Sequence, residues 1–326
     1  KNKGILIQKI NHWMRLVFFG TPKFAQTALE RLLQSRHQVA AVVTAPDKPA
    51  GRGRKQTPSE VKEFALSKNL EVLQPDKLTD AGFLRRIGEI AADLFAVVAF
   101  RILPEKLFAI PRHGAINLHA SLLPRYRGAA PIERAIIDGA TKTGVTTFRI
   151  AKSVDTGGIL LAREISIGQN ETFEDLYPKL ADIGANLLVE TIDGIEDGTL
   201  TTVPQDDALA SPAPKITPAD SPIDWSRPAI AIINQIRGLA GSADAYTVLD
   251  GKRLKILRAA LSEQINGSHA PGEIIAADRS HGLIVASGTG AVRLIEVCLE
   301  GKKRMDSSAF LNGVRLTPGV RLISAS

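Results

Sequence analysis

Residues 15–33 read RLVFFGTPKFAQTALERLL, and this stretch decides the fold class of the first half of the chain. The β-branched and aromatic run 15–19 predicts a buried strand, Gly20-Thr21-Pro22 predicts a turn, and the apolar residues from Phe24 to Leu33 recur at helical spacing. Further strands are predicted at 39–44, near 72, at 94–99 and at 116–118, with helices at 58–68 and 83–90 between them. This alternation predicts an α/β domain with a mostly parallel, Rossmann-like sheet that is covered on both faces.

The second half of the chain has a different pattern. Strands are predicted at 145–150 and 159–165, followed by a long amphipathic helix that ends near 194–198. Residues 204–222 then hold five prolines, which predicts a stiff linker rather than a packed element. After a helix at 230–239, short strands at 246–249, 253–257, 272–275, 283–286 and 292–299 predict a small β-barrel. We therefore expect an N-terminal extension 1–13 before Met14, a first domain 14–203, a linker 204–222 and a C-terminal domain 223–326.

Composition narrows the classes of protein to consider. The 326 residues include 41 lysines and arginines and 34 acidic residues, and the net charge of +7 favours an anionic partner or simply solubility. The single cysteine, Cys298, excludes an internal disulfide and a cysteine zinc site, so a reducing, cytoplasmic location is expected. No apolar run approaches the ~20 residues that a membrane helix needs. Residues 1–13 lack the apolar core of a signal peptide.

Candidate catalytic side chains follow the strand predicted at 116–118. Residues 117–124 read NLHASLLP, and Asn117 and His119 share one face because side chains alternate along a strand. Sites in open parallel sheets form at the carboxyl ends of strands. A second segment, SVDTGG at 153–158, contains Asp155 before a glycine turn. A satisfied core histidine and a turn-capping aspartate would give the same patterns. Together, the three residues supply an oxyanion donor, a proton carrier and a carboxylate that orients the imidazole.

These segments resemble the folate-dependent formyltransferase family. The resemblance rests on Asn117-x-His119, on Ser121-Leu122-Leu123-Pro124 and on Asp155-Thr156-Gly157, and it implies that Asn117, His119 and Asp155 are the catalytic trio. Residues 19–22, 46–53, 125–132 and 223–225 resemble more narrowly the members that act on initiator methionyl-tRNA. The resemblance runs from Met14 to the C-terminus. It implies a formyltransferase catalytic domain at 14–203 and an OB-like β-barrel at 223–326 that binds tRNA. It also implies formyl transfer from 10-formyltetrahydrofolate without a metal, and a monomer is expected.

The same resemblance implies the residues that bind folate and tRNA. The folate pocket would be formed by Phe100, Arg101, Ile102, Ser121, Leu122, Leu123, Pro124 and Val154. The segment that begins at Phe100 departs from the relatives. They have a glycine after the aromatic residue and one more residue before Ile-Leu-Pro, whereas here Arg101 follows Phe100 directly. The tRNA acceptor stem would contact Arg52, Arg54 and Lys55, although an isolated basic loop of this kind is usually only solvated. A second departure from the relatives lies at 238–245. The lysines and arginines at 252, 253, 255, 258 and 302–304 form a basic set that suits contact with a phosphate backbone.

Three other functions remain open at this level. The first is a transferase of the same family that acts on a small amine, such as a nucleotide-linked sugar or glycinamide ribonucleotide, but it would not need the basic loop 46–55 or a basic C-terminal domain. A formyl-folate hydrolase would use the same trio with water in place of the amine. A catalytically silent RNA-binding module would not need Asn117, His119 and Asp155 together.

Overall fold

The computed structural model describes residues 13–50, 55–263 and 268–324. Seven strands form one sheet in the order β10-β9-β7-β6-β1-β2-β5. Their bounds are β1 (Arg15–Gly20), β2 (Gln38–Val43), β5 (Val72–Leu73), β6 (Leu94–Val98), β7 (Ala115–His119), β9 (Lys142–Arg149) and β10 (Ile159–Ser166). β5, β2, β1, β6 and β7 run parallel, and β9 is antiparallel to β7. The predicted mostly parallel sheet is confirmed.

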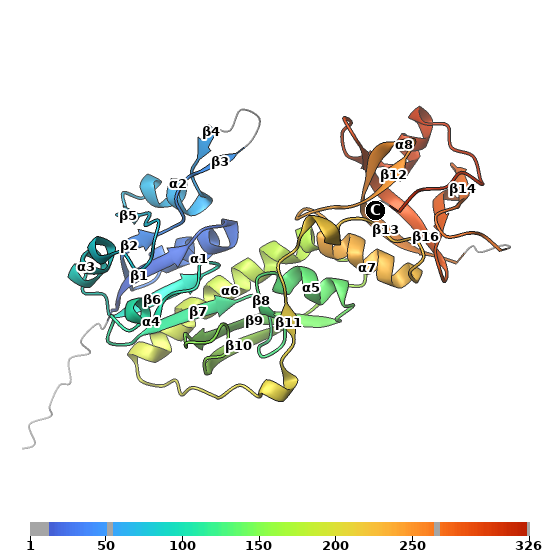
Figure 1. Ribbon diagram of the computed structural model, residues 1–326. Coiled ribbons are helices and arrows are strands. Elements are labelled where there is room, and N and C mark those ends of the chain that lie inside the picture. The colour runs from blue at the N-terminus through green and yellow to red at the C-terminus, as the bar shows by residue number, and fades with distance from the viewer. Residues whose placement is uncertain (1–12, 51–54, 264–267, 325–326) are drawn as a thin grey trace, which may run out of the picture. The chain divides into compact units, whose positions relative to one another are not determined.

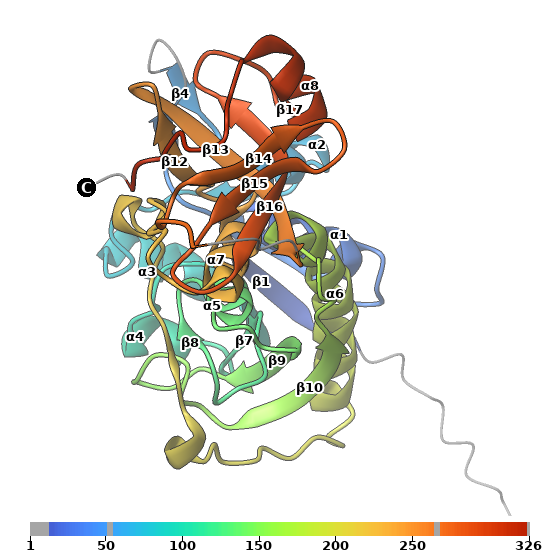
Figure 2. The same cartoon turned by 90° about the vertical axis from the view of Figure 1, so that its right-hand side faces the viewer.

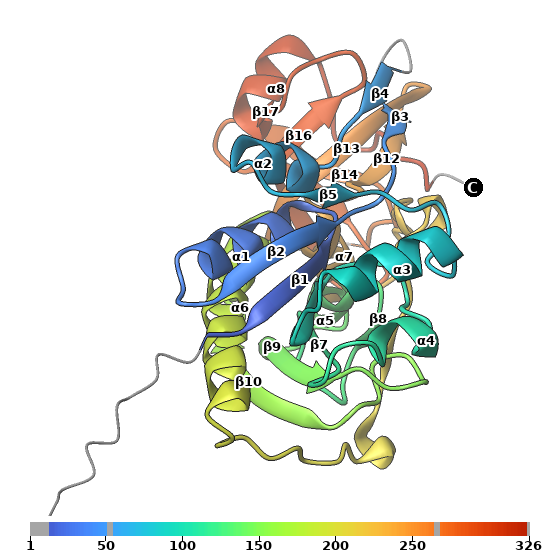
Figure 3. The same cartoon turned by 90° about the vertical axis from the view of Figure 1, so that its left-hand side faces the viewer.

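Helices cover both faces of this sheet. They are α1 (Lys23–Leu33), α2 (Glu60–Ser67), α3 (Ala81–Glu89), α4 (Glu105–Phe108) and α6 (Phe173–Glu196). α2 begins two residues later than the sequence predicts, because its cap is Ser59, whose side chain accepts a hydrogen bond from the backbone N–H of Lys62. Figure 1 gives the element labels, and Figure 3 shows α1 on one side of β1 and β2 and α3 and α4 on the other.

Side-chain alternation places the candidate catalytic residues on a definite face. Ala115 of β7 belongs to the buried cluster that α3 and α4 complete, so Asn117 and His119 point to the same side of the sheet. Leu118 points to the opposite side, where α6 approaches. A Cβ at Gly184 of α6 would lie 3.0 Å from the Leu118 side chain, so glycine permits the close packing of this helix. The strand that carries the candidate site is thus buried on both faces.

The C-terminal part is an antiparallel sheet with helices, in the order β12-β13-β16-β15-β14, with β17 beside β16 (Figure 2). The bounds are α7 (Ala229–Leu239), β12 (Ala245–Leu249), β13 (Lys252–Ser262), β14 (Ile274–Asp278), β15 (Gly282–Ala286), β16 (Ala291–Leu299), β17 (Met305–Asp306) and α8 (Ser307–Gly313). Buried Trp225 donates a hydrogen bond from Nε1 to Thr247 Oγ1 at 3.0 Å in the core of this part. The antiparallel strands were predicted, whereas closure into an OB-like barrel remains a prediction.

The segment 204–222 differs from the unpacked linker that its prolines predict. Its strand β11 (Pro212–Ala213) pairs in parallel with β8 (Arg127–Gly128), which precedes α5 (Pro131–Ile137), and Ala213 is fully buried. A Cβ at Gly128 would lie 2.6 Å from the Ala213 carbonyl oxygen, so this backbone contact needs glycine. Prolines at 212 and 214 restrict the chain but do not prevent one strand pair from forming.

By internal packing the chain divides into two compact units. One comprises the chain up to His119 together with Val145–Arg163 and Ala181–Asp206, and the other comprises Ala120–Gly144, Glu164–Leu180 and the chain from Asp207 onward. Within the described ranges, every helix is too short or too polar to cross a bilayer.

Candidate active site

His119 and Asp155 lie together at the carboxyl end of β7. The distance from His119 Nδ1 to Asp155 Oδ2 is 3.8 Å, and the two side chains are 7% and 10% exposed. This distance is long for a direct hydrogen bond and is short enough for an ion pair or for contact through one water molecule. The structure therefore brings together the imidazole and the carboxylate that the sequence separates by 36 positions.

The loop that carries Asp155 is fixed by its own backbone. Asp155 has φ of 55°, a left-handed conformation in which aspartate is enriched among non-glycine residues. A Cβ at Gly157 would lie 1.6 Å from the Arg149 carbonyl oxygen, so only glycine fits there. Gln205 Nε2 donates hydrogen bonds to the carbonyl oxygens of Asp155 and Gly157 at 2.9 and 2.8 Å. Gln205 is thus a positioning residue, and nothing in the local sequence indicates that it acts 50 positions away.

Asn117 has an amide oxygen that is buried without a hydrogen-bond partner among the described residues. An unsatisfied buried polar atom of this kind costs about 1–3 kcal/mol, and in a native protein it needs an explanation. The opposite rotamer of the amide would place its NH₂ group in the same position. Either way, the Asn117 side chain offers an unused hydrogen-bonding position on the same strand face as His119.

The side chain of Arg101 fixes the Phe100–Ile102 segment, to which it belongs. The Arg101 guanidinium lies 5.2 Å from the centre of the Phe100 ring, and Phe100 in turn contacts Phe19 at 5.6 Å between ring centres. Arg101 also donates to the carbonyl oxygens of Pro75 and Asp76 at 2.7 and 2.9 Å. Its side chain therefore anchors the segment, whereas the neighbouring Ile102 is 71% exposed.

The other predicted folate-pocket residues are distributed between core and surface. Ser121 and Leu123 are buried, and the Ser121 hydroxyl donates to the Arg125 carbonyl oxygen at 2.6 Å, so these two residues shape their own loop. Leu122 and Pro124 are half-buried. Val154, next to Asp155, is 48% exposed, a large exposure for an apolar side chain beside two buried polar groups.

Of the predicted tRNA-contacting residues, Arg52 and Arg54 lie outside the described residues, and Lys55 begins strand β4 (Lys55–Thr57). β4 pairs antiparallel with β3 (Lys48–Ala50), so a hairpin carries this loop. Asp47, just before β3, accepts hydrogen bonds from Lys62 Nζ at 2.6 Å and Gln74 Nε2 at 2.8 Å. The Lys62 ammonium, and then Gln74, lower the pKa of the Asp47 carboxyl. The base of the hairpin is thus anchored to its own unit.

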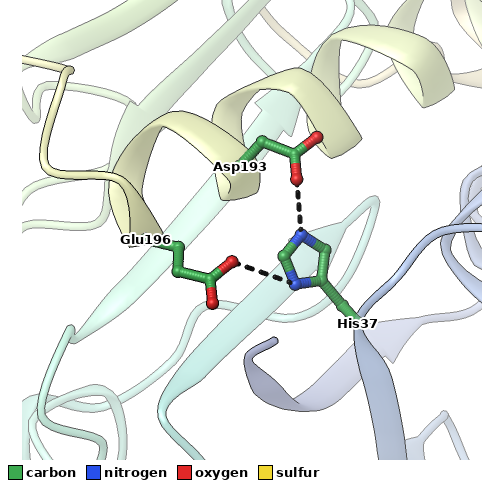
Figure 4. A group of neighbouring side chains, drawn as sticks. All are labelled: His37, Asp193 and Glu196. Atoms are coloured by element: carbon green, nitrogen blue, oxygen red, sulfur yellow. Dashed lines mark ion pairs between the residues drawn. The ribbon is translucent and has the colours of Figure 1, made fainter. Parts of the chain in front are cut away.

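One group in the described part of the chain has the composition of a metal site, namely His37, Asp193 and Glu196 (Figure 4). His37 Nδ1 accepts a hydrogen bond from the Met14 backbone N–H at 3.1 Å, so the neutral ring carries its proton on Nε2, 3.2 Å from Asp193 Oδ1. A metal ligand must instead offer an unprotonated nitrogen. The Arg36 guanidinium already contacts Asp193 at 2.6 Å and Glu196 at 3.0 Å. We therefore interpret this group as an ion-pair cluster.

The basic set of the C-terminal part is divided by its ion pairs. Arg258 donates to Asp175 at 2.9 Å, and Arg304 contacts Glu296 at 2.5 Å and Glu174 at 2.8 Å. Burial raises the pKa of Asp175, but hydrogen bonds from Arg258 and Thr172 outweigh it and bring the value to about 2. Arg258 and Arg304 thus each have acidic partners within their own unit, and phosphate contact by the basic set stays a prediction.

The family models and the relatives that match this chain agree on one family. The model of the formyl transferase family matches residues 14–192, and the model of the formyl transferase C-terminal domain matches residues 215–315. The methionyl-tRNA formyltransferase of Geobacter metallireducens is 45% identical over 310 residues, which are 95% of this chain and 98% of the relative. That of Moorella thermoacetica is 44% identical over 94% of this chain and 98% of the relative.

Two solved structures share the fold at lower identity. A sugar 3N-formyl transferase, crystallised with dTDP and 5-N-formyl-THF, is 21% identical and superposes with a TM-score of 0.65 over 90% of this chain and 100% of its own. HypX from Aquifex aeolicus, in complex with tetrahydrofolic acid, is 17% identical, with a TM-score of 0.63 over 97% of this chain and 51% of its own.

Proposed function

The chain belongs to the formyl transferase family, and from this premise we propose that it transfers the formyl group of 10-formyltetrahydrofolate to the α-amino group of methionine on initiator tRNA. The observation that carries the chemistry is the pairing of His119 with Asp155 at 3.8 Å, at the end of the strand that also holds Asn117, whose amide oxygen has no hydrogen-bond partner among the described residues. The product is N-formylmethionyl-tRNA, which serves translation initiation.

The proposed reaction is a nucleophilic acyl transfer. The amine nitrogen attacks the formyl carbon, a C–N bond forms, and negative charge develops on the formyl oxygen. Asn117 and His119 stabilise this oxygen by hydrogen bonds. The proton that the amine loses moves toward His119, whose imidazolium form the Asp155 carboxylate stabilises, and the bond to N10 of the folate breaks as that nitrogen regains a proton.

The surroundings of the trio suit a folate donor. Ile102 and Val154 expose apolar side chains on two loops of the same unit, and an aromatic pteridine would bury such surface. We propose that Phe100, Arg101, Ile102, Val154 and the loop Ser121-Leu122-Leu123-Pro124 hold the donor. Because the Arg101 side chain is engaged by two carbonyl oxygens, its contribution to the pocket is through the backbone.

Similarity beyond the catalytic part favours tRNA over a small amine. The relatives named methionyl-tRNA formyltransferase match 95% of this chain, including the C-terminal domain. We propose a catalytic domain at 14–203, a linker at 204–222 and a tRNA-binding domain at 223–326. Arg52, Arg54 and Lys55 would add contacts from the hairpin of β3 and β4. We propose a monomer, because all residues that this chemistry needs come from one chain. The role of the relatives in translation supports a cytoplasmic location.

A direct assay tests this function. The protein is incubated with 10-formyltetrahydrofolate and methionyl-initiator tRNA, and formylmethionine is measured after hydrolysis of the ester. Glycinamide ribonucleotide, an amino sugar nucleotide and water alone serve as competing acceptors. Faster turnover on any of these than on the charged tRNA would replace the proposed acceptor.

Asp155→Asn is expected to slow turnover while the protein remains folded. The amide keeps the size of the carboxyl but removes the charge that stabilises the imidazolium form of His119. Single-turnover rates with preformed complexes measure the chemical step directly. Asp278→Asn, at an exposed aspartate that pairs with His281, is the matched control. A turnover equal to that of the parent would reject Asp155 as the partner of His119.

Arg52→Ala is expected to weaken the use of charged tRNA while folate affinity stays near that of the parent. Each lost phosphate contact lowers the salt dependence of tRNA binding by about one unit of logarithmic slope. The measurement is tRNA affinity against salt concentration, with donor affinity in parallel. Lys68→Ala, which removes an exposed charge at the end of α2, should leave the slope unchanged. Equal slopes for Arg52→Ala and the parent would remove this loop from the tRNA interface.

A further inference from the structure

A cavity of about 400 Å³ lies in the C-terminal part. Its walls come from residues 216–221, from the start of β12 and from β13, and all of them belong to one compact unit. The backbone joins the walls, because Tyr246 N–H donates to the Ser221 carbonyl oxygen at 2.9 Å and the Ile223 N–H donates to the Tyr246 carbonyl oxygen at 2.8 Å. The volume falls in the range typical of small-molecule sites, roughly 300–1,000 Å³.

Strand register places three side chains on the same side of the sheet in this cavity. Tyr246 of β12 is directly opposite Lys255 of β13, and Arg253 is two residues before Lys255 on the same face. The Arg253 guanidinium consequently lies over the Tyr246 ring, 4.7 Å from its centre. Such a cation–π contact fixes the plane of the guanidinium and leaves its second face and its N–H groups available.

The two cationic side chains that line the cavity differ in their ion pairing. Lys255 Nζ contacts Asp244 Oδ2 at 2.9 Å, so these two groups offset each other. The Arg253 side chain makes no ion pair and no hydrogen bond with any described residue, although its backbone N–H donates to Glu300 Oε2 at 3.1 Å. Within the basic set, Arg258 and Arg304 are already engaged by acidic groups. Arg253 is thus an exposed, pre-oriented cation at the wall of the cavity, and its guanidinium has no ion-pair partner among the described residues.

We propose that this cavity binds a nucleoside 5′-monophosphate unit. A guanidinium fork matches the geometry of phosphate oxygens, and a nucleobase stacks on the open face of an arginine plane. The cavity volume of about 400 Å³ is many times the roughly 30 Å³ that one water molecule occupies. Inorganic phosphate alone would therefore leave most of the cavity unfilled. Pro218 and Ile216 supply apolar wall for a base and sugar.

The bound nucleoside monophosphate can come from two sources, a free nucleotide or an unpaired nucleotide of a tRNA. The tRNA source rests on the proposed function, whereas the chemistry of the cavity does not. In the tRNA case, this cavity takes one nucleotide of the substrate at a place separate from the formyl acceptor.

Titration calorimetry on the full chain with adenosine 5′-monophosphate tests the proposal. Arg253→Ala should weaken binding by roughly tenfold or more, which corresponds to about 1.4 kcal/mol, because charge-assisted hydrogen bonds to phosphate are among the strong ones. Arg253→Lys keeps the charge without the planar fork and should restore only part of the affinity. Arg293→Ala removes the same group from an exposed position of β16 that does not line the cavity, and it should leave the affinity unchanged. Thermal unfolding confirms that each variant is folded.

Competition identifies the source. Displacement of the nucleotide by uncharged initiator tRNA in the parent supports a tRNA nucleotide. Arg253-dependent binding without displacement supports a free nucleotide. The proposal is overturned if the nucleotide binds no more tightly than inorganic phosphate, or if Arg293→Ala and Arg253→Ala weaken its binding equally. The formylation assay is independent of these results, so a parent that forms no formylmethionine would overturn the proposed function and leave the nucleotide measurement standing.

Discussion

His119→Ala is expected to lower the turnover of formyl transfer by roughly two to four orders of magnitude, the contribution typical of a positioned proton-transfer group. His119 is 6% exposed and lies 3.8 Å from the Asp155 carboxylate at the end of β7. Its loss would leave this carboxylate without the imidazole that it faces. Affinities for tRNA and for the folate donor should stay near those of the parent, because the imidazole acts mainly on groups whose charge changes in the transition state.

Single-turnover rates with preformed complexes separate this chemical defect from a binding defect. His281→Ala is the matched control, since His281 is also paired with an aspartate but lies on the surface of another unit. Added imidazole should partly restore the rate of His119→Ala and should not affect the control. If turnover of His119→Ala stays within a few-fold of the parent, the catalytic assignment is wrong.

Asn117→Ala is expected to lower kcat by roughly 10²–10³, the cost of removing one oxyanion hydrogen-bond donor. The KM for either substrate should change little, because the oxyanion exists only in the transition state. Stability should behave differently from activity. The Asn117 amide oxygen is a buried atom without a partner in the described structure, so its removal offsets part of the packing that is lost.

The measurements are steady-state kinetics and the free energy of unfolding from denaturant titration. Asn234→Ala is a useful comparison, because the amide oxygen of that buried asparagine accepts from Arg237 at 3.0 Å and its loss should destabilise the protein. An Asn117→Ala variant that is destabilised as strongly as Asn234→Ala and keeps its kcat would show that Asn117 is a structural residue.

Much of the site was predictable because it depends on local pattern. The alternation in 115–119 fixes Asn117 and His119 on one strand face, and the turn at 155–158 needs an aspartate and glycines in left-handed or crowded positions. Both features are properties of a few adjacent residues. The strands and helices of the parallel sheet follow from the same kind of short-range periodicity.

Contacts between distant segments were not predictable in this way. Gln205 holds the Asp155 loop from 50 positions away, and Ala213 is buried against Gly128 although the surrounding prolines suggested an unpacked linker. The ion pairs of Arg258 and Arg304 remove two cations from a basic set that looked uniform in sequence. Charge in a sequence is counted per residue, whereas its availability depends on the acidic groups that the fold brings beside it.

The sequence by itself therefore determined the alternation of strands and helices that builds the parallel sheet, the face of β7 that carries Asn117 and His119, and the family to which the chain belongs. Only the tertiary structure decided that His119 and Asp155 meet, that Arg101 anchors its segment through two carbonyl oxygens, and that the Arg253 guanidinium lies over the Tyr246 ring without an ion-pair partner among the described residues. The physical reason is the range of the interactions. Secondary structure follows from preferences between residues three or four positions apart, but a pair of side chains from separate loops is set by the packing of the whole core, which no short window of sequence contains.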